Sequence, residues 1–233
     1  MTRAEDVAAV VPAFNEEKTV GAVVRALKAC PLIGEVVVVS DGSTDRTEEE
    51  AVRAGADRLL RLPENVGKGE AMRRGADAVK AGTLFFCDAD LLGFSPENAV
   101  EILRPVIDGR YDMCTGLRDR GPLLTRVIAH LPLLSGERAL RRPVLEGVPP
   151  EFLQGFRVEI ALNYFCRANG LPYGSVPTRG VRNFRKMEKV GFLRGLAGYL
   201  QMIWQIAEAM ILVRLAGRKF KARSSKSEES SKS

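Results

Sequence analysis

Apolar residues in the first half of the chain fall in short continuous runs, and each run is followed by a polar loop and an amphipathic stretch. The run at residues 35–40 contains four consecutive valines. Runs of this length and composition are typical of buried strands in a parallel sheet. The pattern therefore predicts strands at residues 7–11, 35–40, 58–62, 83–87 and 111–115.

The stretches between these strands carry the spacing and the end signals of helices. Apolar residues recur at helical intervals from Val20 to Leu27, and Asn15 is expected to be the N-cap of that helix. The sequence Ser95-Pro96-Glu97 has the residues favoured at a helix start: a capping serine, then proline, then an acid. Helices are predicted at residues 20–27, 48–54, 69–80 and 96–108.

Alternating strands and helices predict an α/β fold with a doubly wound, mostly parallel sheet that is flanked by helices. In such folds ligands bind beyond the carboxyl ends of the strands. Polar side chains suited to ligand binding follow four successive strands, and they are Asn15, Asp41, Lys68 and the pair Asp88 and Asp90. Their convergence predicts a binding site at this edge of the sheet.

The strand at 83–87 ends in Asp88-Ala89-Asp90. If strand geometry continued through this motif, both carboxylates would face the same way and could reach one hard divalent ion. Acidic residues also end strands simply because they favour turns and solvent. The other polar loops at the same edge favour the metal interpretation.

The glycine-containing stretch around Lys68 fits neither of two familiar phosphate-binding motifs. It lacks the upstream glycine and the following Ser or Thr of a P-loop, and Met72 stands where a dinucleotide fingerprint needs its third glycine. A nicotinamide-dependent dehydrogenase is therefore unsupported.

With 233 residues, of which 45% are apolar and 27% charged, the chain suits one α/β domain with a helical C-terminal extension. The net charge of +6 favours anionic partners, and no nucleic-acid-binding pattern is present, so no nucleic acid partner is expected. The four cysteines form no Cys-x-x-Cys pair, and the N-terminal residues show no secretory signal. Reduced core cysteines and a cytoplasmic location are the expectation.

The second half carries weaker signals. A helical pattern runs through residues 156–169, and a strand is expected at 175–181. Residues 196–213 are strongly apolar, but polar residues recur on one face, which predicts an amphipathic helix and not a membrane span. Two arrangements stay open for this helix and the basic residues after it: docking on the domain, or peripheral contact with the inner face of a membrane. The tail at 224–233 is expected to be disordered.

Four motifs occur together in the first half, at residues 11–17 (VPAFNEE), 40–45 (SDGSTD), 65–71 (NVGKGEA) and 88–90 (DAD). In this order and spacing the chain resembles the GT-A glycosyltransferases of the family 2 type. The resemblance implies a Rossmann-like sheet that binds a nucleotide-diphosphate sugar, with Mg²⁺ or Mn²⁺ held against the diphosphate by Asp88, Asp90 or both. It also implies that the nucleotide site includes Pro12, Ala13, Asn15, Glu16, Asp41, Ser43, Gly67, Lys68 and Asp88.

Three motifs in the second half, at residues 133–137 (LLSGE), 158–160 (VEI) and 180–185 (GVRNFR), are similar to those of glucosyl-3-phosphoglycerate synthases. In those enzymes a histidine in the last motif completes the metal site, whereas this chain has Asn183 and Phe184 there. The only histidine, His130, lies among apolar residues and is more typical of a structural position. Either Asn183 or water fills the third position, or carboxylates and diphosphate alone hold the metal.

The resemblance implies transfer of a hexose from UDP-glucose or GDP-mannose to a phosphorylated acceptor such as phosphoglycerate or polyprenyl phosphate. The catalytic candidates are Asp90 at the diphosphate and Glu137 or Glu159, either of which could be a base for an acceptor hydroxyl. Both glutamates could instead bind sugar hydroxyls or form buried pairs with Arg138 or Arg157. The stereochemical outcome stays open.

Two other classes of protein are alternatives. A sugar-phosphate nucleotidyltransferase shares the sheet and the metal carboxylates but should carry a glycine-rich basic loop after the first strand, which is missing here. A nucleotide-sugar-binding protein without transferase activity is the other alternative. The expected organisation is a nucleotide-sugar-binding half (1–115), an acceptor-binding half of the same domain (116–190), an amphipathic segment (191–223) and the tail, with homodimerisation left open.

Overall fold

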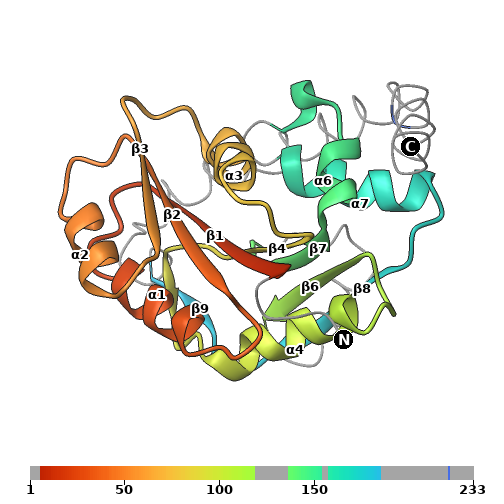
Figure 1. Cartoon of the computed structure of the whole chain (residues 1–233), viewed down its shortest axis with the longest axis horizontal. Helices are drawn as coiled ribbons and strands as arrows, with labels where there is room; N and C mark the ends of the chain where they lie inside the picture. The colour runs from red at the N-terminus through yellow and green to blue at the C-terminus, as the bar shows by residue number, and fades with distance from the viewer. Residues whose placement is uncertain (1–5, 119–135, 154–156, 185–219, 221–233) are drawn as a thin grey trace, which may run out of the picture.

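The computed structural model describes residues 6–118, 136–153, 157–184 and Phe220. These residues build a seven-stranded sheet in the order β3-β2-β1-β4-β7-β6-β8, in which β7 runs antiparallel to both neighbours and the other pairs are parallel. The predicted α/β fold with a mostly parallel sheet is confirmed (Figure 1). The strands are β1 (Val7–Ala13), β2 (Glu35–Asp41), β3 (Arg58–Leu62), β4 (Thr83–Phe86), β6 (Met113–Arg118), β7 (Arg138–Arg141) and β8 (Tyr173–Thr178).

Helices cover both faces of the sheet (Figure 1). On one face lie α3 (Lys68–Asp77), α6 (Arg142–Gly147) and α7 (Arg157–Ala168), and on the other lie α1 (Val20–Lys28), α2 (Thr47–Arg53) and α4 (Pro96–Ile107). A short 3₁₀ helix, η2 (Pro150–Phe152), precedes α7.

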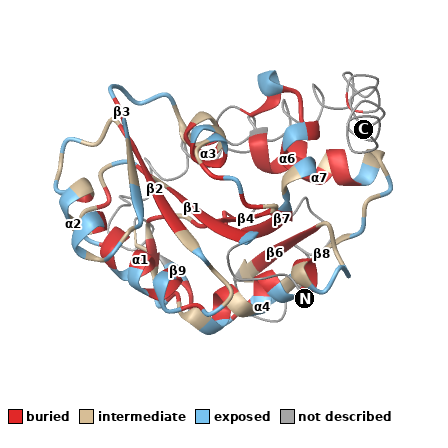
Figure 2. Cartoon of the chain, viewed as in Figure 1, coloured by how far each residue is buried: buried red, intermediate tan, exposed pale blue. Residues whose placement is uncertain are grey.

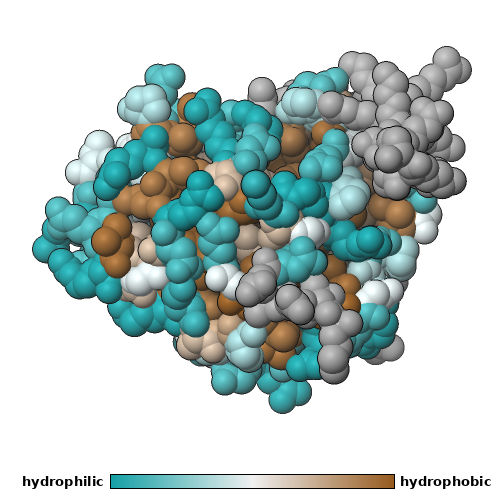
Figure 3. Space-filling model, in the orientation of Figure 1, coloured by the Kyte–Doolittle hydropathy of each residue, from teal (hydrophilic) through white to brown (hydrophobic). Residues whose placement is uncertain are grey.

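The central strands are buried on both faces because side chains alternate between two hydrophobic cores. In β1, Ala8 and Val10 contact the core beneath α3, whereas Ala9 and Val11 contact the core beneath α1. Each fully buried valine contributes about 1.5–3 kcal/mol relative to an exposed one. This burial, red in Figure 2, explains why the apolar runs predicted these strands. The face in Figure 3 is mixed, with hydrophobic residues showing between predominantly hydrophilic ones.

Several predicted element ends need correction. Asn15 is not the N-cap of α1, since that helix starts at Val20 after Thr19, and Asn15 lies in the preceding loop with a φ of 54°. Helix α3 covers Lys68–Asp77 and ends before the predicted residue 80. The opening of α4 is confirmed: the Ser95 side chain accepts a hydrogen bond from the Asn98 backbone N–H, and Pro96 is the first helical residue.

Several elements of the structure were not predicted from the sequence, and most of them lie in the second half. These are β7, α6, η2 and a two-stranded ribbon of β5 (Leu91–Leu92) and β9 (Arg182–Asn183). At Gly93 the backbone has a φ of +73°, and a Cβ there would lie 2.6 Å from the carbonyl oxygen of Gly180. Glycine at position 93 therefore lets the two chain segments approach closely at this end of the ribbon.

Some predictions concern residues beyond the described part, namely His130, the amphipathic segment at 196–213 and the tail at 224–233. Among the described residues, no helix has the length and apolar character needed to cross a membrane. The four cysteines are buried and free, as predicted.

Candidate active site

The loops after β1 and β2 are joined by hydrogen bonds. The Asn15 backbone N–H donates to the Ser43 hydroxyl at 3.2 Å, and the Asn15 side-chain oxygen accepts from the Thr44 backbone N–H at 2.8 Å. The Ser43 hydroxyl in turn donates to the carbonyl of Ala13 at 3.3 Å, where β1 ends directly after Pro12. Four of the predicted nucleotide-binding residues, Pro12, Ala13, Asn15 and Ser43, thus lie in one connected unit.

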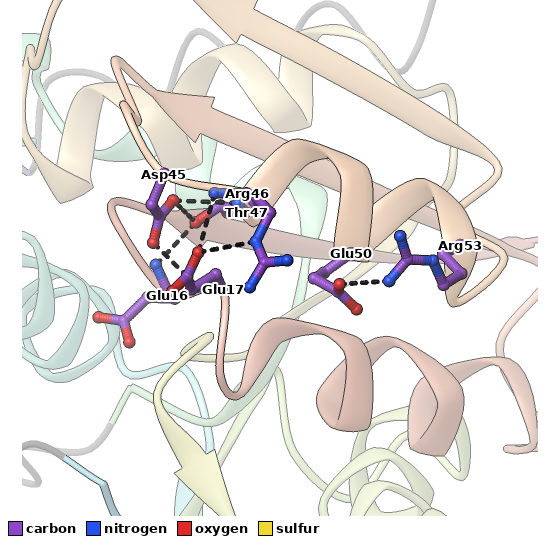
Figure 4. A network of polar contacts seen from close by, with 7 residues as sticks. All are labelled: Glu16, Glu17, Asp45, Arg46, Thr47, Glu50 and Arg53. Atoms are coloured by element: carbon purple, nitrogen blue, oxygen red, sulfur yellow. Dashed lines mark hydrogen bonds and ion pairs between the residues drawn. The ribbon is translucent and has the colours of Figure 1, made fainter.

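Glu16 and Glu17 attach the first loop to the start of α2 (Figure 4). The Glu16 N–H donates to the Thr47 hydroxyl at 2.7 Å, and the Glu17 N–H donates to the Asp45 carboxylate at 3.1 Å. Desolvation opposes ionisation of Asp45, but hydrogen bonds from Thr47 and Glu17 outweigh it and lower the pKa of this carboxyl group. The β1 and β2 loops are therefore fixed relative to each other before any ligand binds.

Asp41, the last residue of β2, is 4% exposed and binds the loop between β3 and α3. Its carboxylate accepts hydrogen bonds from the backbone N–H groups of Val66 at 2.8 Å and Gly67 at 2.9 Å. This contact fixes the entry into α3, whose first residue is Lys68. Asp41 therefore positions Lys68, a role that the sequence did not predict.

Lys68 connects two carboxylates from distant parts of the chain. Its ammonium nitrogen lies 2.7 Å from Asp88 Oδ1 and 3.0 Å from Glu159 Oε1, and Glu159 belongs to the first turn of α7. Burial alone would lower the pKa of Lys68, but the two carboxylates outweigh burial and raise it. Lys68, Asp88 and Glu159, all predicted as site residues, are thus brought together.

Asp88 lies beyond the end of β4, which stops at Phe86, and Asp90 lies in a turn. Strand geometry does not continue through the motif, so side-chain alternation cannot be used to orient this pair. Asp88 packs against Gly136: a Cβ on Gly136 would overlap the Asp88 carboxylate. Only a residue without a side chain fits opposite Asp88 in this arrangement.

The β5–β9 ribbon brings the predicted third metal position next to the acidic motif. Leu91 pairs with Asn183, and the Phe184 N–H donates to the carbonyl of Asp90 at 2.9 Å. Phe184 cannot be a metal ligand because its side chain has no oxygen, nitrogen or sulfur atom. Its ring lies 5.4 Å from the ammonium of Lys18. Asn183 is therefore placed beside the motif by its backbone.

The residues present fit a divalent ion that shares its ligands with a substrate. Asp88 and Asp90 supply hard carboxylate oxygens, which suit Mg²⁺ or Mn²⁺. Within the described residues, no group of three or more His, Cys, Asp or Glu side chains could hold a metal ion. The diphosphate of a bound nucleotide would supply the further oxygens that such ions require.

Behind these residues, Glu137 and Arg138 have no exposed surface. Burial lowers the pKa of Arg138, and the nearby carboxylates of Glu159 and Asp88 oppose the shift. From the sequence, Arg138 was expected only as a possible buried ion-pair partner of Glu137 or Glu159. Its position directly after Glu137, the last residue of the motif at 133–137, is a weak sequence signal that Arg138 belongs to the site.

The fold and the loops at the carboxyl ends of β1, β2 and β4 define an α/β protein of the GT-A class. Residues 8–165 match the family described as glycosyl transferase family 2, and the chain belongs to this family. The suspected resemblance is confirmed at this level.

The chain is similar to glucosyl-3-phosphoglycerate synthases, both in sequence and in solved structures. Glucosyl-3-phosphoglycerate synthase of Mycolicibacterium smegmatis is 35% identical over 192 residues, which cover 67% of this chain and 62% of that protein. The crystal structure of glucosyl-3-phosphoglycerate synthase from Mycobacterium tuberculosis with Mn²⁺, UDP-glucose and phosphoglyceric acid has a TM-score of 0.72 and 26% identity, covering 91% of this chain and 81% of that one. A structure of the same enzyme with Mg²⁺ and uridine diphosphate has a TM-score of 0.70 and 25% identity, covering 92% and 81%.

The matched segment spans less than two thirds of the curated relative's length. The chain shares the GT-A fold with the solved structures, whereas its activity and substrates are matters for a proposal.

Proposed function

We propose that this chain is a metal-dependent glycosyltransferase that moves a hexose from a nucleotide-diphosphate sugar to a phosphorylated acceptor. The observation that carries the proposal is the contact of Lys68 with Asp88 and Glu159 beside the joined β1 and β2 loops. It provides a cation and carboxylates at the edge where such sheets bind ligands. UDP-glucose is the favoured donor and phosphoglycerate the favoured acceptor, because the solved relative binds both; GDP-mannose and polyprenyl phosphate are the alternatives.

Transfer requires that the departing diphosphate be stabilised while positive charge develops on the sugar. Asp88 and Asp90 would hold the Mg²⁺ or Mn²⁺, with Asn183 as the third candidate ligand, and the metal would neutralise the diphosphate. Lys68 would add a positive charge on the same side. Pro12, Ala13, Asn15, Glu16, Asp41, Ser43 and Gly67 would form the nucleotide-binding walls.

The acceptor oxygen decides whether a base is needed. A phosphate oxygen, as on polyprenyl phosphate, needs no strong base, whereas the hydroxyl of phosphoglycerate does or must pass its proton to the leaving phosphate. Glu137 and Glu159 are the candidate carboxylates. Glu159 binds Lys68 and Glu137 has no exposed surface, so these contacts favour neither glutamate over the other.

Purified protein with Mn²⁺ and radiolabelled UDP-glucose or GDP-mannose, offered phosphoglycerate or a short polyprenyl phosphate, tests the proposal. Labelled glucosyl-phosphoglycerate is the expected product. Binding of UDP-glucose without turnover on either acceptor would favour a binding protein, and release of diphosphate from sugar phosphate and UTP would favour a nucleotidyltransferase.

Asp90 offers a direct test of the metal assignment. Asp90→Asn removes a negative ligand and is expected to lower activity at least about 100-fold, as does loss of other preorganised groups at developing charge. Asp77→Asn, on the exposed surface of α3, is the matched control. Full activity of Asp90→Asn with Mg²⁺ would show that Asp90 is not a metal ligand.

The organisation into donor half, acceptor half and C-terminal segment, the peripheral membrane contact and homodimerisation are further parts of the proposal. Flotation with anionic vesicles and light scattering of the full chain test the last two. Failure to float would favour docking of the C-terminal segment on the domain.

A further inference from the structure

In this structure the positive charge in contact with Asp88 is the ammonium group of Lys68. Lys68 Nζ lies 2.7 Å from Asp88 Oδ1, and the two side chains are only 26% and 21% exposed. Gly136 packs so closely against the same carboxylate that a Cβ there would overlap it. A divalent ion that bound Asp88 would therefore have to share a small, partly enclosed carboxylate with an ammonium group.

A divalent ion and the Lys68 ammonium bound to the same carboxylate would repel each other, and the repulsion is strong where water is largely excluded. A bound diphosphate changes this balance, because its oxygens offer the ammonium a new acceptor and the metal additional ligands. An ammonium group has three donors, so it can leave one carboxylate and keep another.

We infer that Lys68 is the counter-ion of Asp88 in the absence of donor and that a divalent cation takes its place only together with a diphosphate. This inference rests on the proposed function, in which Asp88 is a metal ligand. It deepens that proposal by coupling the two binding events. The nucleoside diphosphate and the metal bind together, and the metal alone binds weakly.

Glu159 is the positioning residue in this exchange. Its side chain is 7% exposed, less than that of Asp88, and it comes from the opposite half of the chain, 91 residues from Lys68. It holds the ammonium in the site after Asp88 has passed to the metal. The acidic motif and α7 are thereby coupled through one lysine.

Manganese binding measured by electron paramagnetic resonance, with and without uridine diphosphate, tests the exchange. The key variant is Lys68→Met/Glu159→Gln, which removes one charge of each sign and leaves no unpaired buried glutamate. It should bind Mn²⁺ without nucleotide about 10-fold more tightly than the unmodified protein, a change equivalent to ~1.4 kcal/mol. The gain in Mn²⁺ affinity on adding uridine diphosphate should shrink.

The matched control is Lys28→Met/Asp57→Asn, which removes another lysine–carboxylate pair, 2.6 Å apart, on the exposed surface. It should leave Mn²⁺ binding unchanged. If the Lys68→Met/Glu159→Gln variant binds Mn²⁺ alone no more tightly than the unmodified protein, the exchange is refuted. If neither the unmodified protein nor either double variant shows nucleotide-dependent Mn²⁺ binding, and the unmodified protein transfers no hexose, the proposed function is refuted instead.

Glu159→Gln alone tests the positioning role. It should raise the KM for the donor several-fold while changing kcat less, and Glu159→Asp should restore part of the loss. An equal fall in kcat with an unchanged KM would refute this role and support a base. Thermal unfolding of each variant separates these effects from loss of the fold.

Discussion

Gly136→Ala isolates the packing that places Asp88. The added methyl group would overlap the Asp88 carboxylate, so either this side chain or the backbone entering β7 must move. Overpacking of a well-packed region typically costs about 1–3 kcal/mol. Movement of the carboxylate would also lengthen the 2.7 Å contact with Lys68.

We expect Gly136→Ala to lower the free energy of unfolding by about 1–3 kcal/mol and to weaken binding of Mn²⁺ with uridine diphosphate by at least about 10-fold, or ~1.4 kcal/mol. Urea denaturation followed by circular dichroism gives the first quantity, and calorimetry the second. The matched control is Gly21→Ala in α1, where a Cβ would lie 3.3 Å from the flexible end of Arg25. Alanine within a helix is favourable by about 0.5–1 kcal/mol, so this control should be at least as stable as the unmodified protein.

A second comparison shows whether the methyl group acts through Asp88. In an Asp88→Gly background the overlapping carboxylate is absent, so adding Gly136→Ala should cost much less stability than it does in the unmodified protein. The reasoning is refuted if Gly136→Ala leaves both stability and Mn²⁺–nucleotide binding unchanged, or if its cost is the same in the two backgrounds.

Three further predictions concern the support of the site and the core. Asp41→Asn replaces an acceptor of two backbone hydrogen bonds, so it should lower the free energy of unfolding by about 1.5–3 kcal/mol and raise the donor KM. The control Asp57→Asn loses a similar bond from the Val36 N–H and should lower stability alone. Equal donor KM values for the two variants would contradict the positioning role of Asp41. Hydrogen bonds from Arg73 and Arg74 lower the pKa of Glu70 from 4.5 to about 2, so its stabilising effect is complete above pH 4.5 and is lost as the pH falls towards 2. Glu70→Gln should flatten the pH dependence of the urea midpoint in that interval, and an unaltered profile would refute the assignment. Burial raises the pKa of Cys114 to about 11 and that of Cys166 to about 12, so native protein should react slowly with thiol reagents at neutral pH and rapidly in urea; rapid reaction of the native protein would contradict this burial.

The sequence predicted the parts of the fold that are dictated by local pattern. The valine run of β2 and the capping residues of α4 carry their own signals, because burial on both faces and helix-end hydrogen bonds depend on nearby residues. Strand β7 reads Arg-Ala-Leu-Arg and has no such signal, since it becomes a strand only by pairing between β4 and β6.

The site was predictable to a similar extent. The loops that follow β1, β2, β3 and β4 could be assigned to one edge from strand order alone. The contact between Lys68 and Glu159 joins residues 91 positions apart, and no periodicity reports it. The backbone hydrogen bonds of Asp41 were likewise hidden, because an acidic residue at a strand end looks the same whether it binds a ligand or a neighbouring loop.

The placement of β7 has a consequence for how the chain can be assembled. Within the described sheet, β7 lies between β4 and β6, so the first 118 residues contain two strands whose shared neighbour arrives later in the chain. A fragment that ends there would expose the open edges of β4 and β6, which are sites for mispairing and aggregation. The boundary between the proposed donor and acceptor halves is thus not a boundary between folding units. Exchanging acceptor halves between related chains would have to carry β7 and its partners together.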